Sequence, residues 1–155
     1  MPLSIRPAAP AERVALAPLL DAYAAEMRGV LHGEAAASGE AIAALLAADA
    51  RTELLVAWQE GAPQGFALFY DLPEIVFARR CGQLDDLFVL PTARGQGIAR
   101  KLVEAVGEAG RTRGWSHLRW FVPEGDHAAI ALYQRIAEQA PWRSYIQRLD
   151  PAASL

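Results

Sequence analysis

The sequence has a single cysteine, Cys81, and no apolar run approaching the roughly 18 residues needed to cross a bilayer. A lone cysteine forms no internal disulfide, which agrees with a reducing compartment. Arg79 and Arg80 precede it and would favour a reactive thiolate, but we interpret the thiol as a bystander. The first residues also lack the basic segment and apolar core of a secretory signal peptide. We therefore expect a cytoplasmic protein with no membrane partner.

An excess of charge of one sign is also missing. The 155 residues include 15 Lys and Arg against 18 Asp and Glu, for a net charge of -3, so we expect no nucleic-acid partner. The composition, 53% hydrophobic and 21% charged, is that of an ordinary globular chain long enough to bury a core. We expect one domain over residues 1–150 and a disordered tail at 151–155.

Metal and nucleotide motifs are missing as well. His32, His117 and His127 do not have the spacing of a zinc site, and Cys81 has no partner thiol, so we expect no metal. No Gly-Lys-Ser or Gly-Lys-Thr ends a mononucleotide P-loop. A dinucleotide fingerprint would need a third glycine where Arg100 stands.

What the sequence does contain is a glycine-rich loop at a helix start. A predicted strand at 83–90 ends at Pro91, and Gly95 and Gly97 then lead directly into a predicted helix. Glycines let backbone amides approach a ligand, and the unpaired first-turn N–H groups favour an anion. The loop therefore predicts a phosphate-binding site.

The loop sequence Arg94-x-x-Gly97-x-Ala99, preceded by Leu-Phe-Val-Leu-Pro, resembles the acyl-CoA pyrophosphate loop of the GNAT superfamily of N-acyltransferases. A second family element is the Ala-Ile-Ala-Leu-Tyr at 129–133, and together the two elements cover about a third of the chain. The resemblance implies an α/β fold with a mixed, mostly antiparallel sheet, a splayed parallel central strand pair and about four flanking helices. It also implies an acetyl-CoA-dependent N-acetyltransferase.

Periodicity and turn residues predict the elements along the chain. They are a strand at 3–6, a helix at 10–30, a helix at 38–48, hairpin strands at 53–59 and 64–71, a strand at 83–90, a helix from 98 to about 110–114, a strand at 117–122, a helix from 127 and a strand at 144–149. Pro18 either begins the main part of the first helix or kinks it. Ser38 and Asp126 are the predicted N-caps of the second and the last helix. Residues 75–78 either continue the preceding strand or form a loop.

The resemblance assigns the contacts to acetyl-CoA, the cosubstrate. The residues implied for the pyrophosphate are Arg94, Gly95, Gln96, Gly97, Ile98, Ala99 and Arg100. The main chain of Leu87, Phe88 and Val89 would hydrogen-bond to pantetheine as if it were an added strand. A backbone N–H at Val89 or a neighbour would polarise the thioester carbonyl.

Acetyl transfer to an amine requires a neutral amine, whereas an alkylamine with a pKa of about 10.4 is mostly protonated at pH 7. The departing thiolate also needs a proton. The resemblance makes Tyr133 the candidate general acid, with a core tyrosine on an amphipathic helix as the alternative. Asp85 and Asp86 are adjacent on a predicted strand, so only one faces the acceptor.

The strand at 84–89 resembles that of polyamine acetyltransferases, in which the first acid is a base or anchors a water relay. This places Asp85 in the catalytic role and Asp86 as a tentative substrate contact. The alternative is an acidic pair with a structural role. Another family base, a glutamate late in the fifth strand, aligns with Phe121 and is absent.

The resemblance also implies pocket residues for the acceptor: Tyr23, Met27, His32 and Trp142. Core packing is the alternative for Tyr23 and Met27, and a solvated side chain for His32. The acceptor would be a small-molecule or peptide amine, and a homodimer is compatible with the family. The alternative function is a non-catalytic acyl-CoA-binding or sensing domain.

Overall fold

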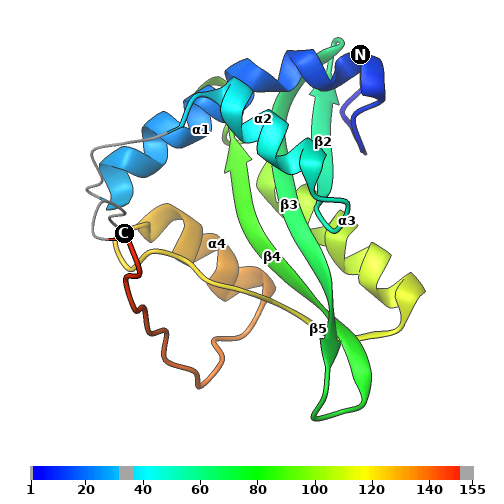
Figure 1. Cartoon of the computed structure of the whole chain (residues 1–155), viewed down its shortest axis with the longest axis vertical. Helices are drawn as coiled ribbons and strands as arrows, with labels where there is room; N and C mark the ends of the chain where they lie inside the picture. Colours follow the sequence, from blue (N-terminus) through cyan, green and yellow to red (C-terminus); the bar gives the residue numbers. More distant parts are fainter. Residues whose placement is uncertain (1, 32–36, 151–155) are drawn as a thin grey trace.

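The computed structural model describes residues 2–31 and 37–150. Their strands form one five-stranded sheet in the order β1-β2-β3-β4-β5 (Figure 1). The strands are β1 (Ser4–Arg6), β2 (Glu53–Gln59), β3 (Ala62–Glu74), β4 (Arg79–Val89) and β5 (Trp115–Trp120). All neighbouring strands are antiparallel except β4 and β5, which are parallel. The α-helices of the described ranges are α1 (Leu16–Leu31), α2 (Gly39–Ala48), α3 (Ile98–Arg113) and α4 (His127–Ile136). The expected α/β class is confirmed.

Apolar side chains on both faces of the sheet are buried. On one face, Leu19 and Leu20 of α1 pack with Phe66 of β3, and α2 adds partly buried side chains. On the other face, Leu102 and Val106 of α3 pack with residues of the same strands. The central strands β3 and β4 therefore carry apolar residues on both sides, as a sheet covered by helices on both faces requires.

Several local signals formed the expected structure. The N-terminal helical region is divided into a 3-10 helix η1 (Pro10–Ala15) and α1, so Pro18 lies in the first turn of α1, where its missing N–H needs no partner. Ser38 caps α2, because its hydroxyl accepts a hydrogen bond from Ala41 N–H (3.1 Å). The β2–β3 hairpin turns at Glu60 and Gly61, both with positive φ.

The boundaries of the later strands differ from the prediction. Strand β3 continues through Pro73 to Glu74, and β4 begins at Arg79, so 75–78 is the connecting loop. Strand β2 begins opposite Phe69, so the part of β3 that contains Pro73 has no β2 neighbour, and a proline is tolerated at such an open edge. Strand β5 begins two residues earlier than expected, at Trp115.

The strand predicted at 144–149 was wrong. Residues 137–150 have no regular strand or helix, and Tyr145, Ile146 and Leu149 are 86%, 55% and 88% exposed. A short segment needs a sheet partner to become a strand, and this one pairs with none of the described strands. The tail expected at 151–155 lies outside the described residues. None of the described helices is long and apolar enough to cross a membrane.

Two irregularities of β4 shape the region beside α1. The register against β3 shifts between Leu68 and Phe69, so that Asp85 is an extra residue on β4. Pairing with β5 extends only as far as Leu84 opposite Trp120. Beyond β5 the chain runs away from β4 toward α4 (Figure 1). The last part of β4 therefore has one edge paired with β3 and the other without a strand.

Candidate active site

A loop joins the end of β4 to the start of α3. Leu90 continues the ladder by donating its N–H to Gln64 O (2.8 Å), and a 3-10 turn, η2 (Pro91–Ala93), follows. Gly95 (φ 79°) and Gly97 (φ 75°) then take left-handed conformations that favour glycine. A Cβ built on either glycine would meet no atom within 4 Å, so the loop borders open space.

Main-chain amides converge on that space. Gly97 is the N-cap of α3, and its carbonyl oxygen accepts the N–H of Lys101 (3.1 Å). Among the described residues, no main-chain acceptor is found for the N–H groups from Gly95 to Arg100. Unpaired amides at the positive end of a helix dipole bind anions well. The loop therefore offers an anion unpaired amides and open space at both glycines.

The arginines of the loop are already paired. Arg94 donates through Nε to Val89 O (3.0 Å), and its guanidinium forms an ion pair with Glu26 of α1. Arg100 donates to Glu104 one turn along α3 (2.8 Å). The electrostatic attraction of the loop for an anion therefore comes mainly from its amides, and the Arg94 side chain braces the loop against α1.

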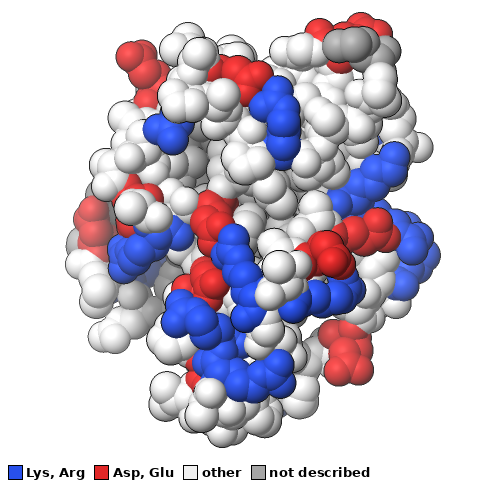
Figure 2. All heavy atoms as spheres, turned by 90° about the vertical axis from the view of Figure 1, so that its right-hand side faces the viewer, with Lys and Arg blue, Asp and Glu red and all other residues white. Residues whose placement is uncertain are grey.

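Elsewhere on the surface, opposite charges also lie close together. Figure 2 shows basic side chains beside acidic ones on one face of the molecule. The ion pairs include Arg113 with Glu53 (2.6 Å) and Arg111 with Glu108 (3.0 Å). This arrangement gives no support for a polyanion-binding surface, in line with the near-balanced composition.

The open edge of β4 leads into the loop. Because the Leu90 N–H donates toward β3, strand alternation turns the N–H and C=O of Val89 toward the opposite edge. The Arg94 side chain accordingly reaches the Val89 carbonyl there. The side chains of Phe88 and Val89 are buried, and Leu87 packs partly buried against the core. Only the main chain of this segment is available to a ligand lying along the edge.

Tyr133 of α4 packs beside the end of β5. Its ring makes an edge-on contact with Trp120, with ring centroids 5.4 Å apart and an interplanar angle of 70°. Burial, with a smaller contribution from the negative charge of Asp126, raises the pKa of Tyr133 to about 12. Asp126 caps α4 by accepting Ala129 N–H (3.1 Å), as expected. The phenol is therefore protonated throughout the neutral range.

The acidic pair lies on the side of the sheet that faces α1. The Tyr23 hydroxyl donates to the Asp86 carboxylate, and the Tyr23 ring packs on Phe66 and Phe88 (centroids 5.3 and 5.5 Å). Burial raises the pKa of Asp86 above its ordinary value, although the Tyr23 hydrogen bond opposes the shift. Burial and the Asp86 charge likewise hold the pKa of Tyr23 well above its usual range. Asp85 is exposed.

Comparison with known proteins identifies the family. The model of the "Acetyltransferase (GNAT) family" matches residues 17–137. The chain belongs to the GNAT acetyltransferase family. The match includes the loop, the open strand edge and α4, so the features described above are those of an acetyltransferase domain.

Several relatives of this GNAT chain are acetyltransferases. Thialysine N-epsilon-acetyltransferase of Mus musculus is 31% identical over 86 residues, covering 52% of this chain and 50% of that protein. The Caenorhabditis elegans protein of the same name is 34% identical over 99 residues, covering 59% of this chain and 58% of its own. The chain spans about half the length of these curated relatives.

Solved structures share the whole fold. Ribosomal-protein-alanine N-acetyltransferase from Brucella melitensis biovar Abortus 2308 superposes with a TM-score of 0.80 at 32% identity, covering 96% of this chain and all of that one. An integron cassette protein of V. cholerae has a TM-score of 0.84 at 20% identity, which is a likeness of fold alone. GNAT enzymes use acetyl-CoA, and the amide-lined loop fits its pyrophosphate.

The structure brings some predicted site residues of this GNAT domain together and separates others. Tyr23 contacts Asp86 directly, and Met27, one turn later on α1, is partly buried. Trp142 is 84% exposed, in a segment without regular structure. His32 lies outside the described residues.

The bulge removes the strand alternation on which the assignment of the two aspartates rested. Leu84 belongs to the core on the α3 side, whereas Asp86, two residues later, lies opposite Leu68 on the α1 side. Asp85 is close enough for its charge to raise the pKa of both Tyr23 and Tyr70. The two carboxylates therefore act on the same group of tyrosines.

Sequence reasoning missed two residues of this region. Glu26 pairs with Arg94 across 68 positions, and burial and the charge of Asp85 raise the pKa of Tyr70 in β3. A charged residue immediately before Met27 on the same helix was the available signal for Glu26. For Tyr70 the sequence had none, because its place beside Asp85 depends on the register of β3 against β4.

Proposed function

We propose that this domain transfers the acetyl group of acetyl-CoA directly to an amine of a small molecule or peptide, with both substrates bound together. The observation that carries the proposal is the open edge of β4, which leads straight into an amide-lined loop at the start of α3. Acetyl-CoA matches that combination, because its extended pantetheine arm carries the thioester at one end and joins the pyrophosphate at the other. A strand edge supplies hydrogen bonds along its length, and a helix start binds the anion.

In this proposal the amides from Gly95 to Arg100 bind the pyrophosphate, and Ile98 and Ala99 contribute through their main chain. The main chain of Leu87 and Val89 pairs with the pantetheine amides along the open edge. The Val89 N–H, turned toward that edge, polarises the thioester carbonyl. Arg94 holds the end of β4 in shape through its bond to the Val89 carbonyl oxygen.

The amine nitrogen would attack the thioester carbonyl carbon, and the carbon–sulfur bond would break as the amide forms. Tyr133 would give its phenolic proton to the departing thiolate. A pKa of about 12 suits that role, since the proton is present at neutral pH before the sulfur leaves. Positioning both substrates side by side lowers much of the barrier, so no covalent protein intermediate is required.

Asp85 would receive the proton lost by the amine, directly or through a water molecule. A carboxylate is a weak base beside an alkylamine, so its larger contribution is to attract the ammonium group and orient the water. Asp86 and Tyr23 would form the wall behind it. The exposed position of Asp85 and its reach to Tyr70 support a site open to an incoming acceptor.

We propose that the acceptor is a primary alkylamine that carries a positive charge in solution. Two carboxylates close to Tyr23 and Tyr70 favour a cation over a neutral aromatic amine. The relatives support an amine acceptor. Their names specify the ε-nitrogen of thialysine in one case and a ribosomal-protein alanine in the other.

The proposal is tested by incubating the protein with acetyl-CoA and a panel of alkylamines, lysine analogues and peptides with free N-termini. Release of the CoA thiol is followed in solution, and mass spectrometry identifies the acetylated amine. We expect thiol release that depends on the acceptor. Tight binding of acetyl-CoA without turnover on any amine would instead support the acyl-CoA-binding or sensing alternative.

A further inference from the structure

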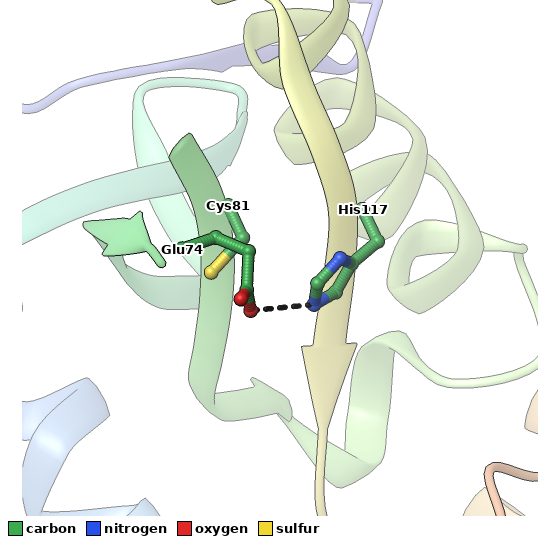
Figure 3. Close-up of side chains that lie close together, drawn as sticks. All are labelled: Glu74, Cys81 and His117. Carbon is green, nitrogen blue, oxygen red and sulfur yellow. Dashed lines mark ion pairs between the residues drawn. The ribbon is translucent and has the colours of Figure 1, made fainter. Parts of the chain in front are cut away.

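A group of three metal-binding side chains lies away from the candidate active site (Figure 3). Glu74 ends β3, Cys81 lies near the start of β4, and His117 is in β5. One ligand atom from each of the three lies within 4.8 Å of the others. The strands are neighbours in the sheet, so the backbone holds the three side chains at fixed spacing.

The His117 ring is already oriented for coordination. The Ser116 hydroxyl lies 3.3 Å from the Arg80 carbonyl oxygen and 3.0 Å from His117 Nδ1. A hydroxyl that donates to Arg80 accepts from Nδ1–H, and in the neutral ring this places the lone pair on Nε2, the nitrogen that faces Glu74. A hydrogen bond at the other ring nitrogen is the usual support of a metal-bound histidine.

The Glu74 carboxylate is held in the same way. Its Oε1 accepts the Val76 N–H (2.9 Å), while Oε2 lies 4.0 Å from His117 Nε2. The Glu74 side chain is only 12% exposed. Arg119 lies 3.7 Å from Oε2, and its bond to the Gln83 side chain (3.0 Å) holds the guanidinium beside the three ligands.

The Glu74 oxygen and His117 Nε2 therefore face each other at 4.0 Å, a gap too long for a hydrogen bond. In the neutral ring, the Nε2 lone pair and the carboxylate oxygen can both bind a cation placed between them. The Cys81 side chain is fully buried beside these two groups. Solvent reaches Glu74 and His117 from the side of the partly exposed His117 ring. Nitrogen, oxygen and thiolate sulfur together form a ligand set that matches zinc.

We propose that Glu74, Cys81 and His117 bind one zinc ion, with water as a fourth ligand. Zinc bonds of about 2.0 Å to nitrogen and oxygen and about 2.3 Å to sulfur require the side chains to draw together by about 1 Å. On binding, Cys81 gives up its thiol proton to solvent and becomes a thiolate. The ion links β3, β4 and β5 at the end of β4 far from the pyrophosphate loop.

The sequence predicted no metal because these ligands come from three strands with unrelated spacing. Zinc sites that are readable from sequence have ligands a few residues apart on one turn. Here the separations are set by sheet register alone. The same register makes the proposed ion a cross-link of the sheet, so binding should raise the thermal stability of the protein.

The test is titration of the purified full chain with cobalt(II), followed by competition with zinc. We expect one equivalent of cobalt, a thiolate-to-cobalt charge-transfer band and the visible spectrum of a tetrahedral site. The wild-type band reports Cys81 directly, so the buried cysteine need not be mutated. His117→Gln and Glu74→Gln each remove a ligand, so each should weaken zinc binding by more than the roughly 10- to 100-fold that the loss of a ligand's hydrogen-bond partner costs.

His127→Gln is the matched control, since His127 is an exposed histidine at the start of α4. It should bind cobalt and zinc like wild type, and zinc should raise the melting temperature of both. Cobalt binding without the thiolate band would mean adventitious binding by histidines and would overturn the proposal. So would the absence of binding, or an equal loss of affinity in His117→Gln and His127→Gln.

Discussion

The hydroxyl of Tyr23 in α1 donates a hydrogen bond to the carboxylate of Asp86 in β4, 63 residues further along the chain. The bond joins the first helix to the bulged part of the central strand, beside the open edge proposed to hold acetyl-CoA. Asp86 is half-buried, and its negative charge is opposed by burial and by nearby Asp85. Through this contact, the folding stability of the domain depends on the charges of the two aspartates beside the proposed acceptor site.

The Tyr23–Asp86 contact predicts how stability depends on pH. Burial raises the pKa of Asp86, so the folded protein keeps that proton to a higher pH than the unfolded chain does. The free energy of unfolding therefore falls as the pH rises above about 4, the ordinary pKa of a carboxyl group. The decrease is complete once the pH exceeds the pKa of Asp86 in the folded protein. Asp86→Asn should be more stable than wild type at pH 7, with the difference vanishing near pH 4.

Urea unfolding at a series of pH values from 4 to 8 would measure this difference. Asp85→Asn is the companion variant, because the charge of Asp85 is a smaller cause of the raised pKa of Asp86. It should reduce the pH dependence without removing it, since burial remains. If Asp86→Asn were less stable than wild type at every pH, the bond from Tyr23 would outweigh the cost of burying the charge.

A second prediction separates the two aspartates in catalysis. Asp85→Asn should raise the KM for the acceptor amine and lower turnover, with acetyl-CoA affinity unchanged, because it removes the exposed charge proposed to attract the ammonium group. Asp86→Asn should be mild in both respects, since an amide still accepts the Tyr23 hydrogen bond. Steady-state kinetics in both substrates would measure this. A crippled Asp86→Asn beside an active Asp85→Asn would reverse the roles.

Tyr133 is tested by removing one oxygen atom. Tyr133→Phe should lower turnover by about a hundredfold or more, the usual loss for a missing general acid. Its ring keeps the contact with Trp120, so stability and CoA affinity should change little. Tyr145→Phe is the matched control, because that tyrosine is 86% exposed and outside the site. Wild-type turnover in Tyr133→Phe would leave Tyr133 as a packing residue.

The pyrophosphate loop offers a test with an internal control. Gly97 and Gly114 stand at opposite ends of α3 with φ of 75° and 74°, and a Cβ at either would meet no atom within 4 Å. Replacing either with valine should cost a similar 1–3 kcal/mol, roughly, through backbone strain. Only Gly97→Val should abolish CoA binding, because its side chain would fill the space bordered by the amides.

Isothermal titration calorimetry with CoA and thermal unfolding of both glycine variants would measure this. Gly114→Val should bind CoA like wild type despite its lower melting temperature. Equal CoA affinity in wild type and Gly97→Val would place the pyrophosphate elsewhere.

Much of the fold was readable from local signals. Ser38 and Asp126 were predicted as N-caps, and each accepts a backbone N–H of its helix as expected. The glycines after β4 were predicted to open a helix start, and Gly97 is the N-cap of α3. These features depend on contacts within about four residues, so the sequence around each one contains the needed information.

The errors involve pairing between distant segments. The segment 144–149 was expected to complete the sheet but lies exposed, because a strand also needs a free sheet edge in the right place. Asp85 and Asp86 were expected on opposite faces, but a bulge against β3 inserts Asp85 and breaks the alternation. A bulge depends on how two strands fit over their full length, which no short window of sequence contains.

The sequence by itself determined the family motifs, the glycine loop, the helix caps and the order of most elements, because each is set by neighbouring residues. The tertiary structure decided which side chains meet. It joined Tyr23 to Asp86, tied Arg94 to Glu26, and gathered Glu74, Cys81 and His117 from three strands. Those contacts follow from sheet register and helix packing, where residues far apart in the chain compete for the same partners.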